Sequence, residues 1–134
     1  MRSKKQSAAK PPDDTVFFID RSLGIEPIRT ELINSGLTVE IHDDHFPRDE
    51  EDRVWLTSVG KRGWVVLTKD QKLRYRPLEI AALRASSARV FVLTAGNLLG
   101  TEIAAAFVAS LPGMRKILRS RRVLSWFAFQ NRDT

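Results

Sequence analysis

The chain of 134 residues contains no cysteine. This absence excludes disulfide scaffolds, thiolate chemistry and cysteine-type zinc sites, and it favours a reducing compartment, so we expect a cytoplasmic protein. No apolar run is long enough to cross a bilayer, and the basic residues near the amino terminus precede no apolar segment of signal-peptide length. We therefore expect no membrane partner.

Acidic residues are the scarcer charged group, with 16 Asp and Glu against 22 Lys and Arg and a formal net charge of +6. This imbalance favours a polyanion as partner. Hydrophobic residues make up 43% of the chain, enough for the core of one domain. Residues 1–14 are polar, contain prolines and show no periodicity, so we expect a flexible arm ahead of a single domain over 15–134.

Short apolar segments alternate with segments of helical periodicity. The predicted strands cover 16–19, 37–42, 64–67, 90–93 and 123–129, and the alternating polarity of 37–42 is typical of a strand near a sheet edge. The predicted helices cover 28–35, 51–60, 77–84 and 100–111, and Pro112-Gly113 is expected to end the last of these before a basic segment over 114–122. The pattern predicts an α/β fold, in which helix layers sandwich a mostly parallel sheet of four to five strands.

Acidic residues occur where these predicted strands end. Asp20 follows the first strand, Asp52 opens the helix after the second, and Asp70 lies just past the third, while Asn97 follows the fourth. In a parallel sheet with right-handed crossovers, the carboxyl ends of the strands share one edge. We therefore expect these side chains to meet at that edge.

Neighbouring carboxylates repel one another, by roughly 3 kcal/mol at about 5 Å and an effective dielectric constant of about 20. Shared protons, basic side chains or a divalent cation would relieve this repulsion, and hard oxygen ligands suit Mg²⁺ or Mn²⁺. Simpler roles stay open for two of the acids. Asp52 could stabilise a helix amino terminus, and Asp70 could cap a turn.

Two further groups of polar residues lie near the predicted edge. A cluster of four cations follows the third strand, where it could hold the phosphates of a nucleic acid: Lys69, Lys72, Arg74 and Arg76. His42 and His45 flank two acids in a polar loop, and solvation explains this loop better than a transition-metal site does.

The ordered set of motifs resembles the PIN-like domain family, specifically the short relatives of the Vap-type toxin ribonucleases. The resemblance runs from about Val16 to Phe129. It rests on the segment 17–24 (FFIDRSLG), the segment 64–70 (WVVLTKD) and the acid-led helix that begins at Asp52.

This resemblance implies a metal-dependent ribonuclease, in which Asp20, Asp52 and Asp70 hold Mg²⁺ or Mn²⁺ and a metal-activated water hydrolyses RNA. Glu51 is a rival to Asp52, because many members place Glu in this helix. Asn97 stands near the position of a fourth acid, with Glu102 a turn further on. Thr68 would orient a ligand or a substrate oxygen, and the cations after it would position the RNA backbone. A small antitoxin is the implied protein partner, and a homodimer is compatible with the pattern.

Two other functions compete with this interpretation. A receiver-like phospho-acceptor domain also places acids at strand ends. Two features count against it: Asp20 stands alone where a receiver has paired acids, and the last predicted strand, 123–129, does not provide the Lys that a receiver needs after its fifth strand. A PIN-like module with weak or no catalysis, used for interaction or nucleic-acid binding, is the second alternative. It is favoured by Asn97 in place of a fourth acid.

Overall fold

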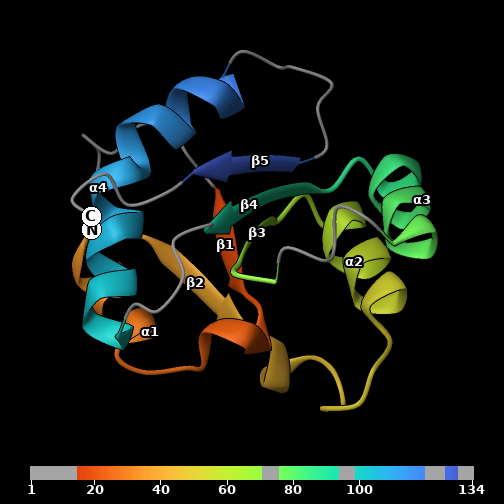
Figure 1. The fold of residues 1–134 in the computed structure, drawn as a ribbon, viewed down its shortest axis with the longest axis horizontal. Helices are drawn as coiled ribbons and strands as arrows, with labels where there is room; N and C mark the ends of the chain where they lie inside the picture. Colours follow the sequence, from red (N-terminus) through yellow and green to blue (C-terminus); the bar gives the residue numbers. More distant parts are fainter. Residues whose placement is uncertain (1–14, 71–75, 94–98, 120–125, 130–134) are drawn as a thin grey trace, which may run out of the picture.

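A computed structural model describes residues 15–70, 76–93 and 99–119, together with the backbone of 126–129 (Figure 1). The expected arm over 1–14 lies outside the described residues, as do three candidate site residues: Lys72, Arg74 and Asn97.

Five parallel strands form one sheet in the order β2-β1-β3-β4-β5 (Figure 1). Their bounds are Val16–Ile19 for β1, Thr38–Ile41 for β2, Val65–Thr68 for β3, Arg89–Leu93 for β4 and Trp126–Phe129 for β5. The edge position of β2 agrees with the alternating polarity of its sequence. In contrast, β1 and β3 are neighbours near the centre of the sheet, which explains why both are almost wholly apolar.

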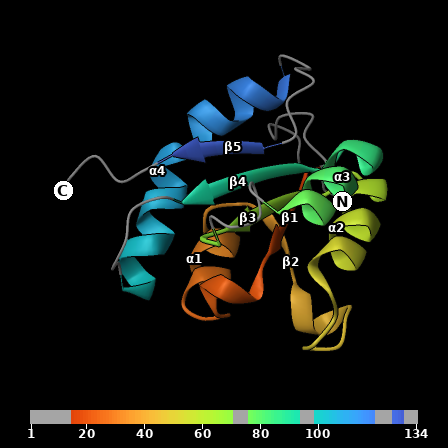
Figure 2. The ribbon, with the colours of Figure 1, turned by 45° about the vertical axis from the view of Figure 1, so that its right-hand side comes forward.

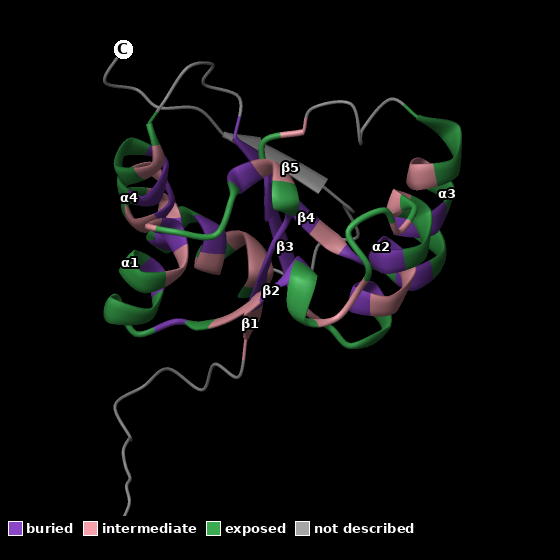
Figure 3. Cartoon of the chain, turned by 90° about the horizontal axis from the view of Figure 1, so that it is seen from below, coloured by how far each residue is buried: buried purple, intermediate pink, exposed green. Residues whose placement is uncertain are grey.

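Helices cover both faces of the sheet, so the predicted three-layer α/β arrangement is confirmed. Helices α1 (Ile28–Asn34) and α4 (Gly100–Arg119) lie on one face, and α2 (Asp52–Lys61) and α3 (Pro77–Ser86) lie on the other (Figures 2 and 3). Short 3-10 helices follow two of the strands: η1 (Arg21–Leu23) follows β1, and η2 (His42–Asp44) follows β2. Within the described residues, no helix is long and apolar enough to span a membrane.

Each face of the sheet contributes to its own apolar core. Phe17 and Ile19 of β1 pack with α1 and α4 in one cluster, whereas Phe18, between them in sequence, packs with Trp55 and α3 in the other. The side chains of Phe17, Phe18 and Ile19 are each 1% exposed or less. This alternation fixes the register of β1, because a shift by one residue would send each set of side chains to the opposite face of the sheet. The strand therefore delivers the next residue, Asp20, to a defined place.

The prediction that Pro112-Gly113 ends the fourth helix is wrong, because α4 continues to Arg119 with Pro112 inside it. An internal proline removes one helical hydrogen bond and costs about 3 kcal/mol. Burial explains why the helix tolerates it. Met114 is 2% exposed in the core, and Ile117 and Leu118 pack against the same cluster, so ending the helix earlier would expose this apolar surface.

Candidate functional site at the carboxyl edge of the sheet

Asp20 is the first residue after β1 and is only 8% exposed. Its backbone N–H donates to the carbonyl of Leu67 at 3.0 Å, which extends the pairing of β1 with β3 by one step. The central position of β1 explains the burial of Asp20, because neighbouring strands flank it on both sides. A carboxylate this enclosed needs hydrogen-bond donors supplied by the protein.

Two hydroxyl groups supply such donors. Thr68, at the end of β3 and fully buried, donates from Oγ1 to Oδ2 of Asp20 at 2.6 Å. Ser22 in η1 donates from Oγ to the same oxygen at 2.9 Å. The two hydroxyl oxygens lie 3.0 Å apart, so the three side chains form one compact group.

Backbone N–H groups orient both hydroxyls. The N–H of Lys69 donates to Ser22 Oγ at 3.1 Å, and the N–H of Asp70 donates to Thr68 Oγ1 at 2.9 Å. Each hydroxyl thereby accepts one hydrogen bond from the chain after β3, and its own hydrogen is left to point at Asp20. The segment after β3 thus serves the Asp20 site through its backbone.

Asp52 begins α2, as predicted, and both of its carboxylate oxygens are engaged. Trp55 donates from Nε1 to Oδ1 at 2.9 Å, and Nη1 of Arg76 lies 3.3 Å from Oδ2 in an ion pair. Both interactions hold the carboxylate in a fixed orientation. The negative charge of Asp52 is close enough to Asp20 to contribute to the titration of Asp20.

The pKa of Asp20 is raised above the ordinary value of 3.8. Burial is the main cause, because it disfavours the charged form, and the nearby charge of Asp52 acts in the same direction. The hydrogen bonds from Thr68 and Ser22 and from the backbone N–H of Arg21 act in the opposite direction but do not cancel the effect of burial. The charged Asp20 is thus incompletely compensated, which is the condition in which a cation would be stabilised beside it.

The other predicted site residues have varied positions. Asp70 is half-buried two residues after Thr68, and Lys69 is exposed. Glu51 is exposed and pairs with Arg53 at 2.8 Å, while Glu102 accepts a hydrogen bond from the N–H of Leu99 at 2.7 Å. The contact of Glu102 is of the capping-box type, so its carboxylate serves the amino terminus of α4.

The donor groups suit the expected cation in kind. Asp20 and Asp52 offer the hard oxygen ligands that Mg²⁺ and Mn²⁺ prefer, and a positive charge between them would offset both burial and mutual repulsion. Among the described residues, however, no group of three acidic or histidine side chains is gathered to hold a metal ion. The structure thus couples two of the acids electrostatically, and the third ligand remains a prediction.

Two contributors to this site, Ser22 and Trp55, were not assigned site roles from the sequence. Arg76 was predicted to hold phosphates with the neighbouring cations, and the structure pairs it with Asp52. Ser22 stands two residues after Asp20, and this spacing allows its hydroxyl to reach back to the carboxylate, which is a local pattern that could have been recognised. Trp55 and Arg76 approach Asp52 from three and 24 residues away in sequence. The contact with Trp55 follows from helical spacing, whereas the contact with Arg76 depends on how α2 and α3 pack.

The two acids between His42 and His45 are exposed, as predicted for a solvated loop: Asp43 and Asp44. The histidines beside them are not simply solvated. His42 is 2% exposed and packs against the rings of Phe18 and Trp55, so it belongs to the core. His45 instead pairs with Glu40 at 2.7 Å. The two rings have separate structural environments.

Comparison with known proteins shows which family this chain resembles. The chain is similar to a protein of Mycobacterium tuberculosis named "Putative ribonuclease VapC45", with 26% identity over 107 residues, which is 77% of this chain and 78% of that protein. No solved structure matches the chain significantly. A family model described as "PIN like domain" matches residues 15–95, which include β1 to β4 and the whole group around Asp20. The chain therefore belongs to the PIN-like domain family.

Proposed function

We propose that this protein is a metal-dependent endoribonuclease and the toxin of a toxin–antitoxin pair. The observation that carries the proposal is the buried carboxylate of Asp20, aligned by two hydroxyls and coupled to Asp52 at the carboxyl edge of a parallel sheet. The family membership and the ribonuclease name of the mycobacterial relative support it. They also favour it over a receiver-like phospho-acceptor.

Asp20 and Asp52 would hold Mg²⁺ or Mn²⁺, and Asp70 is the candidate third ligand. When bound, the ion would supply a water of lowered pKa and would neutralise charge that develops on the phosphate. The protein's own part is positional. Thr68 and Ser22 fix the orientation of Asp20, while Trp55 and Arg76 fix that of Asp52.

Cationic side chains near the site would bind the RNA substrate, and the acidic edge would bind the protein partner. The exposed Lys69 lies next to this site, and with Lys72 and Arg74 it would position the RNA backbone by neutralising phosphates. An antitoxin would inhibit the enzyme by covering the acidic edge or by placing a basic side chain against Asp20. Both partners would meet the protein in the cytoplasm.

Metal binding can be tested without measuring catalysis. Mn²⁺ or Mg²⁺ should raise the melting temperature of the wild-type protein, because a ligand that binds only the folded state stabilises it. Asp20→Asn should abolish this increase, and Asp70→Asn should reduce it, because Asp70 is the proposed third ligand. Glu102→Gln is the matched control, since Glu102 serves α4, and it should retain the full increase. A wild-type melting curve unaffected by either metal would contradict the proposal.

A further inference from the structure

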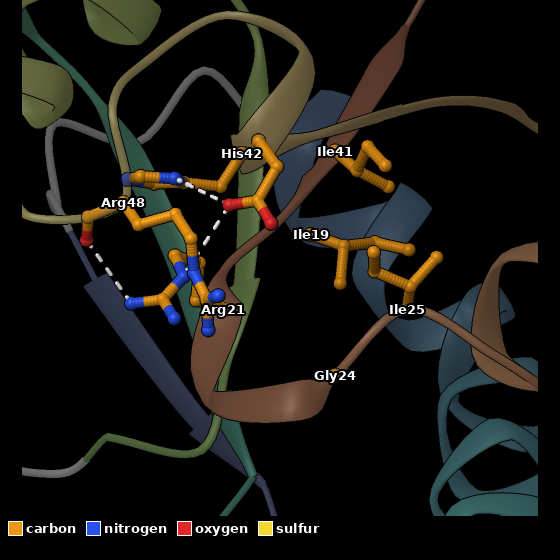
Figure 4. A pocket seen from close by; sticks show the side chains of 8 residues that line it. Ile19, Arg21, Gly24, Ile25, Ile41, His42 and Arg48 are labelled. Atoms are coloured by element: carbon orange, nitrogen blue, oxygen red, sulfur yellow. Dashed lines mark hydrogen bonds and ion pairs between the residues drawn. The ribbon is translucent and has the colours of Figure 1, made fainter.

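A pocket of about 290 Å³ opens between the ends of β1 and β2, on the same sheet edge as Asp20 (Figure 4). Ile19 and Arg21 line it, and they flank Asp20 in the chain. Asp20 itself bonds to Thr68 of β3, the other neighbour of β1. The pocket and the acidic site therefore lie side by side along one edge, separated by the end of a single strand.

One wall of the pocket is apolar. Ile19 and Ile41 are buried in the core, whereas Ile25, which also lines the pocket, is 37% exposed (Figure 4). An apolar surface with one accessible aliphatic side chain can pack against the flat face of a nucleobase, whose hydrogen-bonding groups lie at its edges.

The opposite wall is cationic. Arg21 is held in place by Asp43, 3.3 Å from its Nε, and by a hydrogen bond from Nη1 to the carbonyl of Arg48 at 3.1 Å (Figure 4). The guanidinium of Arg48 makes no hydrogen bond or ion pair with any residue in the described part of the chain. Two guanidinium groups against one carboxylate leave this wall with a net positive charge, and guanidinium groups bind phosphate well.

His42 adds a second sign that the polar wall is incomplete. Its Nδ1 is buried and has no hydrogen-bond partner among the described residues, although it lies 3.4 Å from the Asp43 carboxylate that also holds Arg21. Buried polar atoms are rarely left without a partner, so this ring nitrogen calls for an explanation, and a bound ligand is one. The pocket wall thus combines a fixed arginine, an unengaged arginine and an orphaned ring nitrogen.

We propose that this pocket binds one nucleotide of the RNA that flanks the scissile phosphodiester. Its phosphate would contact Arg21 and Arg48, and its base would cover Ile25. The proposal rests on the proposed ribonuclease function, and it adds a subsite that would make cleavage depend on the nucleotide next to the cut. Charge and shape favour a nucleotide over an acidic peptide, because a peptide carboxylate would use the arginines but leave the apolar wall without a planar partner.

The test measures binding of a fluorescently labelled single-stranded oligoribonucleotide in EDTA, where cleavage and metal binding play no part. Loss of a charge-assisted hydrogen bond should weaken binding about tenfold in Arg48→Ala. Ile25→Ala should weaken binding of the oligonucleotide but not of inorganic phosphate, used as a competitor. Both side chains are exposed, so folding should be preserved, as melting temperature will verify. Arg84→Ala is the matched control, because it removes the same charge from an exposed position on α3.

Three results would overturn the proposal. Wild-type binding in both Arg48→Ala and Ile25→Ala would show that the pocket does not hold RNA, and equal weakening in Arg84→Ala would reduce the effect to overall charge. If Ile25→Ala weakened the binding of inorganic phosphate as much as it weakened the binding of the oligonucleotide, that result would contradict a contact between Ile25 and the base. Failure of the nuclease proposal is distinguishable, because a protein that binds RNA through this pocket in EDTA could still lack metal-dependent cleavage.

Discussion

The hydrogen bond from Thr68 to Asp20 should stabilise the fold measurably, and Thr68→Val tests this. Valine keeps the shape of threonine but removes the hydroxyl, which donates to a carboxylate that is only 8% exposed. A hydrogen bond to a charged group contributes about 1.5–3 kcal/mol, and here water has little access to replace it. The substitution also removes the acceptor of the Asp70 N–H. We expect a decrease of about 2–3 kcal/mol in the free energy of unfolding at neutral pH.

The cost should depend on pH in a defined direction. The Thr68 hydrogen bond favours the charged form of Asp20, so removing it raises the pKa of Asp20 further above its ordinary value. The destabilisation is then largest where Asp20 is ionised in both proteins and decreases as the pH falls and Asp20 becomes protonated. Urea denaturation at neutral and at acid pH measures both values.

A matched substitution and a double-mutant cycle complete this experiment. Thr57→Val removes a threonine hydroxyl that donates to a helix carbonyl, that of Arg53, and to no other group in the described part of the chain; it should cost less than about 0.5 kcal/mol. In an Asp20→Asn background, Thr68→Val should cost less than it does in the wild type. A cost below about 0.5 kcal/mol at neutral pH, or equal costs at both pH values, would refute this account of the site.

Three other predictions concern stability. The folded-state pKa of Asp20 is raised above 3.8, so between the unfolded-state and folded-state pKa values the native protein binds more protons than the unfolded chain. The free energy of unfolding of the wild type should therefore fall as the pH rises through that window. Urea denaturation should show a smaller fall for Asp20→Asn, and an unchanged pH dependence in this variant would be contrary evidence. Gly113→Ala should stabilise the protein by about 0.5–1 kcal/mol, since Gly113 lies within α4 with nothing within 4 Å of an added Cβ. Gly60→Ala in α2 should destabilise the protein, because the added Cβ would overlap the side chain of Ser86. A Gly113→Ala variant less stable than the wild type would contradict a continuous α4.

Much of the fold was predictable because its sequence signals are local. The apolar segments at Val16–Ile19 and Val65–Thr68 are β1 and β3, and the alternation around Thr38–Ile41 correctly indicated an edge strand. Glycine and proline marked most boundaries but not the end of α4, where burial of Met114 outweighs the cost of Pro112. That outcome depends on tertiary packing, which local pattern does not report.

The site was predictable to the level of topology. Parallel strands deliver Asp20 and Asp52 to one edge, and this geometric argument is supported by their electrostatic coupling. Detailed contacts could not be derived in the same way. The ion pair of Arg76 with Asp52 requires the packing of α2 against α3, and the role of Glu102 was decided by a cap at Leu99. The sequence identified candidate ligands, but side-chain geometry determined which of them lie together.

Cleavage of single-stranded RNA by the purified protein is the most direct test of the central claim. Wild-type protein should cut the RNA in Mg²⁺ or Mn²⁺ and lose this activity in EDTA, and Asp20→Asn should be inactive in either metal while remaining folded. Glu102→Gln, prepared in the same way, should cleave like the wild type. The inactivity of Asp20→Asn in the same preparation would then exclude a contaminating nuclease. Cleavage that persists in EDTA, or at the wild-type rate in Asp20→Asn, would contradict a metal-dependent nuclease centred on Asp20.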